Sequence, residues 1–211
     1  MWTKVRLIHM VIDYIIGLMT SDGYTSKYVS KQGVISYRYS IELSDKQILE
    51  DISNLLNTKL FYRKRIIKNK EREFYRVQIP PNYLFDYIYC LNKDRSGIYN
   101  YYKNCNDKYD FIRGLFDGDG SVSYKTNSNT LLRVGFSINS RCSDIKLVID
   151  DFIKTNNLCG STYLDKRGSG SYYISINSQE NVYKFYNYIY QNNPELYLKR
   201  KYNKFTEQNN I

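Results

Sequence analysis

Apolar residues recur along this chain with two spacings, which separate predicted helices from predicted strands. In the first half, helical spacing predicts a helix over about 10–21 that ends before Gly23. A second helix follows the capping-box pattern from Ser44 to Gln47. Its apolar face consists of Ile48, Ile52, Leu55 and Leu56.

Alternating apolar and polar positions predict antiparallel strands around these helices. The strands lie near 24–31, 34–43, 59–67 and 73–79, with Gly33 in the first turn. Pro80 and Pro81 end the sheet and start a third helix through Leu84, Phe85 and Ile88. The predicted unit is therefore α-β-β-α-β-β-α.

Two segments nearly repeat each other, which predicts a duplicated unit. Tyr14–Gly23 reads Tyr-Ile-Ile-Gly-Leu-Met-Thr-Ser-Asp-Gly, and Phe111–Gly120 reads Phe-Ile-Arg-Gly-Leu-Phe-Asp-Gly-Asp-Gly. Asp22 and Asp119 lie 97 residues apart, and the same offset places Ser40-Ile41 on Ser137-Ile138. We therefore predict an α+β fold of two pseudo-symmetric half-domains with antiparallel sheets. Their bounds are 1–92, a polar linker over 93–107, and 108–211 with a basic C-terminal tail.

Each repeated segment combines small residues four apart with a carboxylate at the helix end. The small residues allow two helices to approach closely, and they are Gly17, Ser21, Gly114 and Gly118. Packing of the copies there would bring Asp22 and Asp119 side by side. Two close carboxylates repel unless a proton or cation intervenes, and their hard oxygens suit Mg²⁺. A lone Asp-Gly is more often just a turn, but the duplication favours a paired metal site.

These segments resemble the two motifs of the LAGLIDADG homing endonucleases in the single-chain form. Ile15–Gly23 and Ile112–Gly120 each match the nine-residue pattern, although Thr20 replaces the commoner acidic residue at the sixth position. The resemblance implies a saddle of two four-stranded sheets over DNA, with metal-dependent double-strand cleavage at a long, nearly non-palindromic site. Asp22 and Asp119, with Gly23 and Gly120 beside them, would hold Mg²⁺ or Mn²⁺, and Ca²⁺ would be a non-catalytic substitute.

The resemblance also implies polar and basic residues around the metals. Lys201, with Lys199 as the next choice, is the candidate lysine of the second half, and Lys103 is the candidate of the first. Glu42 and Asn139, at the ends of strands taken as equivalent, match positions where the family has polar residues near the metals.

Strand alternation predicts which side chains could contact DNA. Ile41, Val77 and Ile79 should face the helices, which leaves a polar face opposite them. The candidates for reading base edges on that face are Ser36, Arg38, Ser40, Arg76, Gln78, Arg133, Ser137, Tyr173 and Ser175. Basic residues of the hairpins are candidates for contacts with the DNA backbone, namely Arg63, Arg65, Arg72, Lys166 and Arg167. Any sheet with one solvated face alternates in this way, so each residue alone carries little weight.

Charge and cysteine content agree with an intracellular nucleic-acid-binding protein. The chain has 211 residues, a net charge of +10 and four scattered cysteines without metal-ligand spacing. We expect a monomer from a bacterial, phage or organellar host that binds double-stranded DNA and is not secreted. Two alternatives of the same fold remain open: an intron RNA maturase with host intron RNA as partner, and a DNA-binding regulator without cleavage.

Overall fold

The chain folds into two copies of one unit. The computed structural model describes residues 2–81, 95–124, 131–167, 170–190 and 193–207, with side chains from residue 11 onwards. The first copy contains α1 (Trp2–Asp22), β1 (Gly23–Val29), β2 (Ile35–Leu43), α2 (Lys46–Leu56), β3 (Leu60–Ile67) and β4 (Lys70–Ile79). The second contains α4 (Lys108–Asp119), β5 (Gly120–Tyr124), β6 (Leu132–Asn139), α5 (Ser143–Thr155), β7 (Gly160–Asp165), β8 (Ser171–Ile176) and α6 (Gln179–Tyr190). The predicted α+β class with two pseudo-symmetric halves is confirmed.

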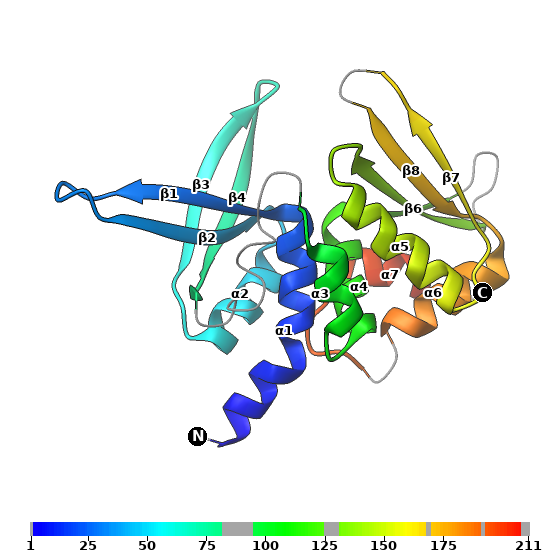
Figure 1. The fold of residues 1–211 in the computed structure, drawn as a ribbon, viewed down its shortest axis with the longest axis horizontal. Coiled ribbons are helices and arrows are strands. Elements are labelled where there is room, and N and C mark those ends of the chain that lie inside the picture. Colours follow the sequence, from blue (N-terminus) through cyan, green and yellow to red (C-terminus); the bar gives the residue numbers. More distant parts are fainter. Residues whose placement is uncertain (1, 82–94, 125–130, 168–169, 191–192, 208–211) are drawn as a thin grey trace.

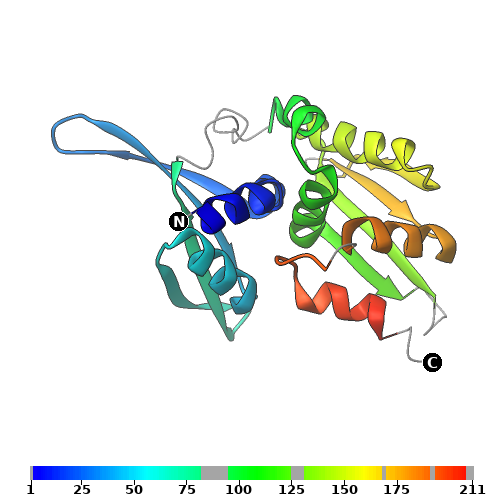
Figure 2. The ribbon, with the colours of Figure 1, turned by 90° about the horizontal axis from the view of Figure 1, so that it is seen from below.

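Two four-stranded antiparallel sheets lie on opposite sides of a central helix pair. Their strand orders are β1-β2-β4-β3 and β5-β6-β8-β7. Figure 1 shows α1 and α4 side by side between the sheets, and Figure 2 shows the same pair from below. Each motif helix runs directly into the first strand of its own sheet, so the helix pair ends where the two sheets begin.

Glycine makes the close approach of α1 and α4 possible. A β-carbon added to Gly17 would lie 2.1 Å from the backbone oxygen of Phe111, and one added to Gly114 would lie 2.0 Å from that of Tyr14. Apolar residues around this contact are fully buried, including Ile15, Leu18 and Leu115. The predicted role of the small residues in helix packing therefore agrees with the structure.

The linker contains a helix that the sequence pattern did not predict. This helix, α3 (Ile98–Asn104), buries Ile98 and Tyr102 although the segment is mostly polar. The backbone N–H of Gly97 donates to Asp144 Oδ2 on α5 at 2.8 Å, which fixes the start of α3. The basic tail likewise forms a helix, α7 (Lys199–Thr206).

The predicted capping box at the start of α2 is wrong. The N-cap residue is Asp45, whose side chain makes no cap hydrogen bond. Instead, Arg200 Nε of the second half donates to Asp45 Oδ1 at 2.9 Å, and Gln47 donates to Asp51. An ion pair between the two halves thus replaces the expected local cap.

The repeat offset of 97 does not hold throughout. Val77 and Ile174 are related by this offset. Their partners on the neighbouring strand are not, because Val77 pairs with Ile41 and Ile174 pairs with Phe136. The equivalent of Glu42 by sheet register is therefore Ser137 and not Asn139. Because the shift is two residues, every side chain keeps its predicted face.

The predicted third helix of the first half, through Leu84, Phe85 and Ile88, lies outside the described residues. Across the part of the chain that is described, no helix is both long and apolar enough to span a membrane.

Candidate functional site

Asp22 and Asp119 are the last residues of α1 and α4, at the point where the helix pair meets both sheets. The two helix ends are in contact: a β-carbon on Gly118 would lie 3.0 Å from Asp22 Oδ2 and would overlap the Ser21 side chain. Both aspartates are half-buried. The structure thus brings together the two carboxylates that the sequence singled out.

Electrostatics at this position are unfavourable for two charged carboxylates. Burial raises the pKa of Asp119 to about 6, and the negative charge of Asp22 adds to the rise. Burial also raises the pKa of Asp22, against the opposing effect of the Lys201 and Arg200 charges. A divalent cation between the carboxylates would remove this repulsion, and oxygen is the ligand that such cations prefer. The residues present therefore fit a hard divalent metal.

Asp119→Asn should stabilise the metal-free protein at neutral pH. Because the folded-state pKa is raised above the ordinary 3.8, the folded protein binds the extra proton between about pH 4 and pH 6. The stability that protonated Asp119 contributes is therefore lost as the pH rises through that window. The asparagine side chain stays uncharged, so the variant does not lose this stability. We expect a higher melting temperature than wild type at pH 7.5 in EDTA, and a much smaller difference at pH 4. Equal differences at both pH values would contradict the assignment.

Lys201 has a different place from the one predicted. Its side chain is only 4% exposed, and Nζ donates to the backbone oxygens of Phe116 at 2.6 Å, Asp117 at 2.7 Å and Gly120 at 2.6 Å. These carbonyls form the C-terminal end of α4, where a cation offsets the helix dipole. Burial lowers the pKa of Lys201 to about 8, although the Asp117 charge opposes this. Lys201 therefore caps the end of α4, and its role as a catalytic residue stays a prediction.

Arg95 caps the end of α1 at the equivalent carbonyls. Its guanidinium donates to the backbone oxygen of Thr20 at 2.9 Å and to that of Gly23 at 2.7 Å. Those positions correspond to Asp117 and Gly120 in the repeat. Sequence reasoning missed Arg95 because the repeat offset does not relate it to Lys201. Arg95 lies in the linker before α3, whereas Lys201 lies on α7.

Lys201→Met should destabilise the fold by about 2–3 kcal/mol, because hydrogen bonds from a charged donor are lost and buried carbonyls are left unpaired. Chemical denaturation at pH 7 measures the change. Lys199→Met is the matched control, since Lys199 lies exposed on the same helix. Unchanged stability of the Lys201 variant would rule out the capping role.

The two motif glycines are needed for space and not for a left-handed turn. Gly120 has φ −77°, and an added β-carbon would lie 2.5 Å from the Phe116 oxygen. At Gly23 the corresponding oxygen, of Met19, would be 2.3 Å away. Their carbonyl oxygens accept hydrogen bonds from Lys201 and Arg95, and their assignment as metal ligands stays a prediction.

The sixth motif position holds Asp117 in the second half and Thr20 in the first, and both side chains are buried. Asp117 is fully buried and accepts hydrogen bonds from Tyr14 Oη and from the Leu198 N–H, both at 2.8 Å. It therefore anchors the segment that leads into α7. Thr20 is also buried, and its hydroxyl donates to the Ile16 carbonyl at 2.8 Å. The hydrogen bonds of both residues indicate a structural role at this position and not a metal-binding one.

The remaining catalytic candidates are only partly supported. Glu42 lies on the open face of its sheet and pairs with Arg63 and Arg65, the latter at 2.5 Å. Asn139 is exposed and accepts from the Arg141 N–H at 3.0 Å. Lys103 lies on α3 and pairs with Asp151 on α5 at 3.7 Å, and its assignment to the metal site stays a prediction. Among the described residues, no group of three or more His, Cys, Asp and Glu side chains could hold a metal ion.

The open face of the first sheet holds arginines against aromatic rings. The Arg38 guanidinium carbon lies 5.3 Å from the Tyr28 ring centroid, and that of Arg76 lies 5.0 Å from the Phe61 centroid. Such stacking holds a guanidinium in place while its N–H groups stay available. Ser36 and Arg72 are exposed as predicted, but Ser40 is 2% exposed, so the prediction that Ser40 is available to a ligand is wrong.

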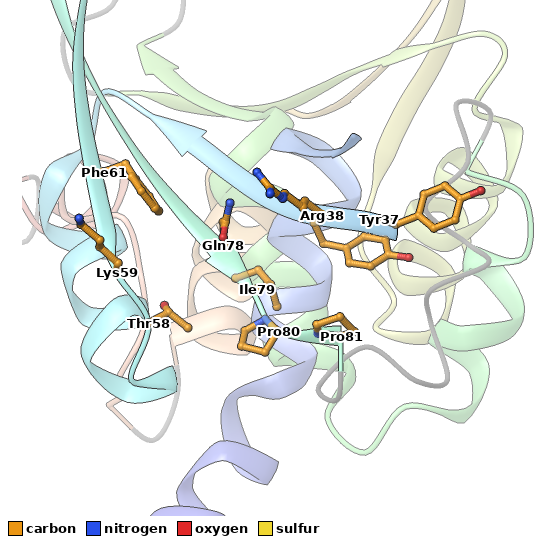
Figure 3. A pocket seen from close by; sticks show the side chains of 10 residues that line it. Tyr37, Arg38, Thr58, Lys59, Phe61, Gln78, Ile79, Pro80 and Pro81 are labelled. Carbon is orange, nitrogen blue, oxygen red and sulfur yellow. The ribbon is translucent and has the colours of Figure 1, made fainter. Parts of the chain in front are cut away.

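A pocket of 320 Å³ lies at the end of β4 and contains two predicted DNA-binding residues, Arg38 and Gln78. Figure 3 shows the polar ends of both side chains pointing to the same side of the sheet. Neither motif aspartate lines this pocket, so it is separate from the carboxylate pair.

The second sheet presents a different polar face. Arg133, Ser137 and Lys166 are exposed, and Tyr173 and Ser175 are half-buried. Arg167 is exposed, but it is engaged with Asp165 through Nη2 at 2.6 Å. Arg133, Ser137, Tyr173 and Ser175 thus lie on one face of the sheet, and Lys166 and Arg167 follow the end of β7.

Comparison with protein families identifies the repeated unit. A model described as a LAGLIDADG-like domain matches residues 10–85 and 107–190. An uncharacterized protein of Methanocaldococcus jannaschii is 26% identical over 182 residues. That match covers 81% of this chain and 20% of the relative, so the chain spans about a fifth of the relative's length.

Several solved structures share this fold. Mesophilic variants of the homing endonuclease I-DmoI superpose with a TM-score of 0.61 at 19% identity, covering 95% of this chain and 98% of theirs. The meganuclease I-AabMI bound to uncleaved DNA gives 0.60 at 14% identity, covering 94% and 89%. I-DmoI has also been solved with DNA and Ca, and with DNA and Mn.

Proposed function

Because this chain belongs to the LAGLIDADG-like family, we propose that it is a site-specific homing endonuclease that makes metal-dependent double-strand breaks in DNA. The observation that carries the proposal is the pair Asp22 and Asp119 at the joined ends of α1 and α4, between two sheets with polar open faces. The solved relatives bound to DNA support the same reading.

In this mechanism Asp22 and Asp119 would hold a divalent cation, with Mg²⁺ as the first choice and Mn²⁺ as an alternative. The cation would neutralise charge on the scissile phosphate and lower the pKa of an attacking water. Arg95 and Lys201 keep the two helix ends, and with them the carboxylates, in place through backbone hydrogen bonds. One carboxylate from each half agrees with cleavage of one phosphodiester bond in each strand.

The two sheets would bind a long site in the DNA major groove. Their strands come from non-identical halves of one chain, so the preferred site should be nearly non-palindromic and the protein should act as a monomer. The α1–α4 contact that a dimer would otherwise supply is already made within the chain.

Selection from a DNA library tests the proposal. A randomised duplex library is incubated with the protein and Mg²⁺, and the cleaved molecules are sequenced. Recovery of one long site, cut in both strands only when a divalent metal is present, would support the proposal. Tight binding of a site without cleavage would indicate a regulator. A parallel selection with a structured RNA library that recovers ligands, when the duplex library gives none, would indicate a maturase.

A further inference from the structure

The two open sheet faces differ in chemistry at equivalent positions. Register places Phe61 opposite Arg76 in the first sheet, and Tyr163 opposite Tyr173 in the second. Arg76 and Tyr173 are related by the repeat offset that β4 and β8 share. In the first sheet a guanidinium stacks on a ring at 5.0 Å, and in the second two rings stack at 5.1 Å.

The first sheet is strongly basic on this face. Alternation and register put one acidic residue, Glu42, among the basic residues Arg38, Arg63, Arg65, Lys70, Arg72 and Arg76. Three of the arginines are held by ring stacking, because Arg65 also stacks on Phe74 at 5.0 Å. Arg76 is fixed further by a hydrogen bond to Tyr24 Oη at 3.3 Å. A fixed guanidinium is suited to bidentate contact with O6 and N7 of guanine.

The second sheet carries hydroxyl groups in place of these charges. Its strands place one basic residue, Arg133, and one acidic residue, Asp165, on the open face. Apart from Gly135 and Asn139, the rest of the face carries hydroxyl groups, on Ser121, Ser123, Ser137, Ser161, Tyr163, Ser171, Tyr173 and Ser175. Ser161 and Ser175 are 2.9 Å apart through their hydroxyl oxygens. Serine contacts several bases without preference, and aromatic rings favour apolar contact with the thymine methyl group.

We propose that the two sheets recognise half-sites of different composition: the first sheet binds a guanine-containing half-site through stacked arginines, and the second binds a guanine-poor half-site through hydroxyl and aromatic contacts. This inference rests on the proposed function, because it assumes that the open faces contact DNA. It goes further by assigning the composition of each half of the target.

Binding selection with position-matched variants tests the inference. The probe is a randomised DNA duplex library with Ca²⁺, selected by wild type and by the Arg76→Ala, Arg76→Lys and Tyr173→Ala variants. Arg76→Lys keeps the charge but loses the bidentate geometry, and circular dichroism melting checks that every variant is folded.

The wild type should select guanine positions concentrated in one half of its site. Arg76→Ala and Arg76→Lys should both lose a guanine preference in that half, with a fall in affinity of about 5- to 150-fold for the best duplex. Tyr173→Ala should change selection only in the other half. Guanines shared equally between halves, or an Arg76→Lys variant with wild-type selection, would overturn the inference alone. Failure of the wild type to select any DNA site would overturn the proposed function as well.

Discussion

Asp22→Asn and Asp119→Asn should each stop double-strand cleavage, lowering its rate by more than about 100-fold. Loss of a residue that merely supports a metal ligand already costs about 10–100-fold, so loss of a ligand should cost more. DNA affinity should stay close to that of wild type, because the sheets make the main contacts in this account. The measurement is cleavage of a selected duplex in Mg²⁺ together with binding in Ca²⁺.

Asp150→Asn is the matched control for these variants. Asp150 pairs with Lys146 on α5, away from the motif helices, and its removal should leave cleavage unchanged. Wild-type cleavage by either motif variant, under conditions where the control also cleaves, would show that the carboxylate pair is not the catalytic centre.

Gly17→Leu or Gly114→Leu should prevent stable folding. An added β-carbon at either position meets the backbone of the facing helix, which cannot move without separating α1 from α4. We expect a loss of at least about 3 kcal/mol, a large part of the stability of a typical domain. Thermal unfolding of purified variants measures the effect.

Gly135→Ala serves as the control for the glycine variants. Its added β-carbon would lie 3.2 Å from the Ser121 hydroxyl oxygen and touch no helix of the central pair, so the effect should be small. If the Gly17 and Gly114 variants were as stable as this control, the α1–α4 contact could not be the close interface described.

Patterns that repeat along the chain predicted the fold well. The duplicated motif placed Asp22 and Asp119 together because both the small residues and the helix ends recur with it. Strand alternation put Val77 and Ile79 in the core because a two-residue period follows directly from strand geometry. The family resemblance is confirmed by the match to residues 10–85 and 107–190.

Features that depend on contacts distant in sequence were not predictable in this way. Asp45 looked like part of a local cap, but Arg200 reaches it from the other half. Lys201 was assigned from the tail pattern, which cannot show that α7 points it at the end of α4. Val77 pairs with Ile41, but its repeat equivalent Ile174 pairs with Phe136, and a single repeat offset cannot represent this change of register between β2 and β6.

The central claim is that Asp22 and Asp119 jointly hold a divalent cation when DNA is bound. Anomalous diffraction from crystals of the full chain with its selected DNA duplex, grown in Mn²⁺, tests it most directly. The account predicts anomalous density within coordination distance of both carboxylates and beside the DNA backbone. Density remote from the two aspartates, or at neither of them in a complex that goes on to cleave its DNA, would contradict it.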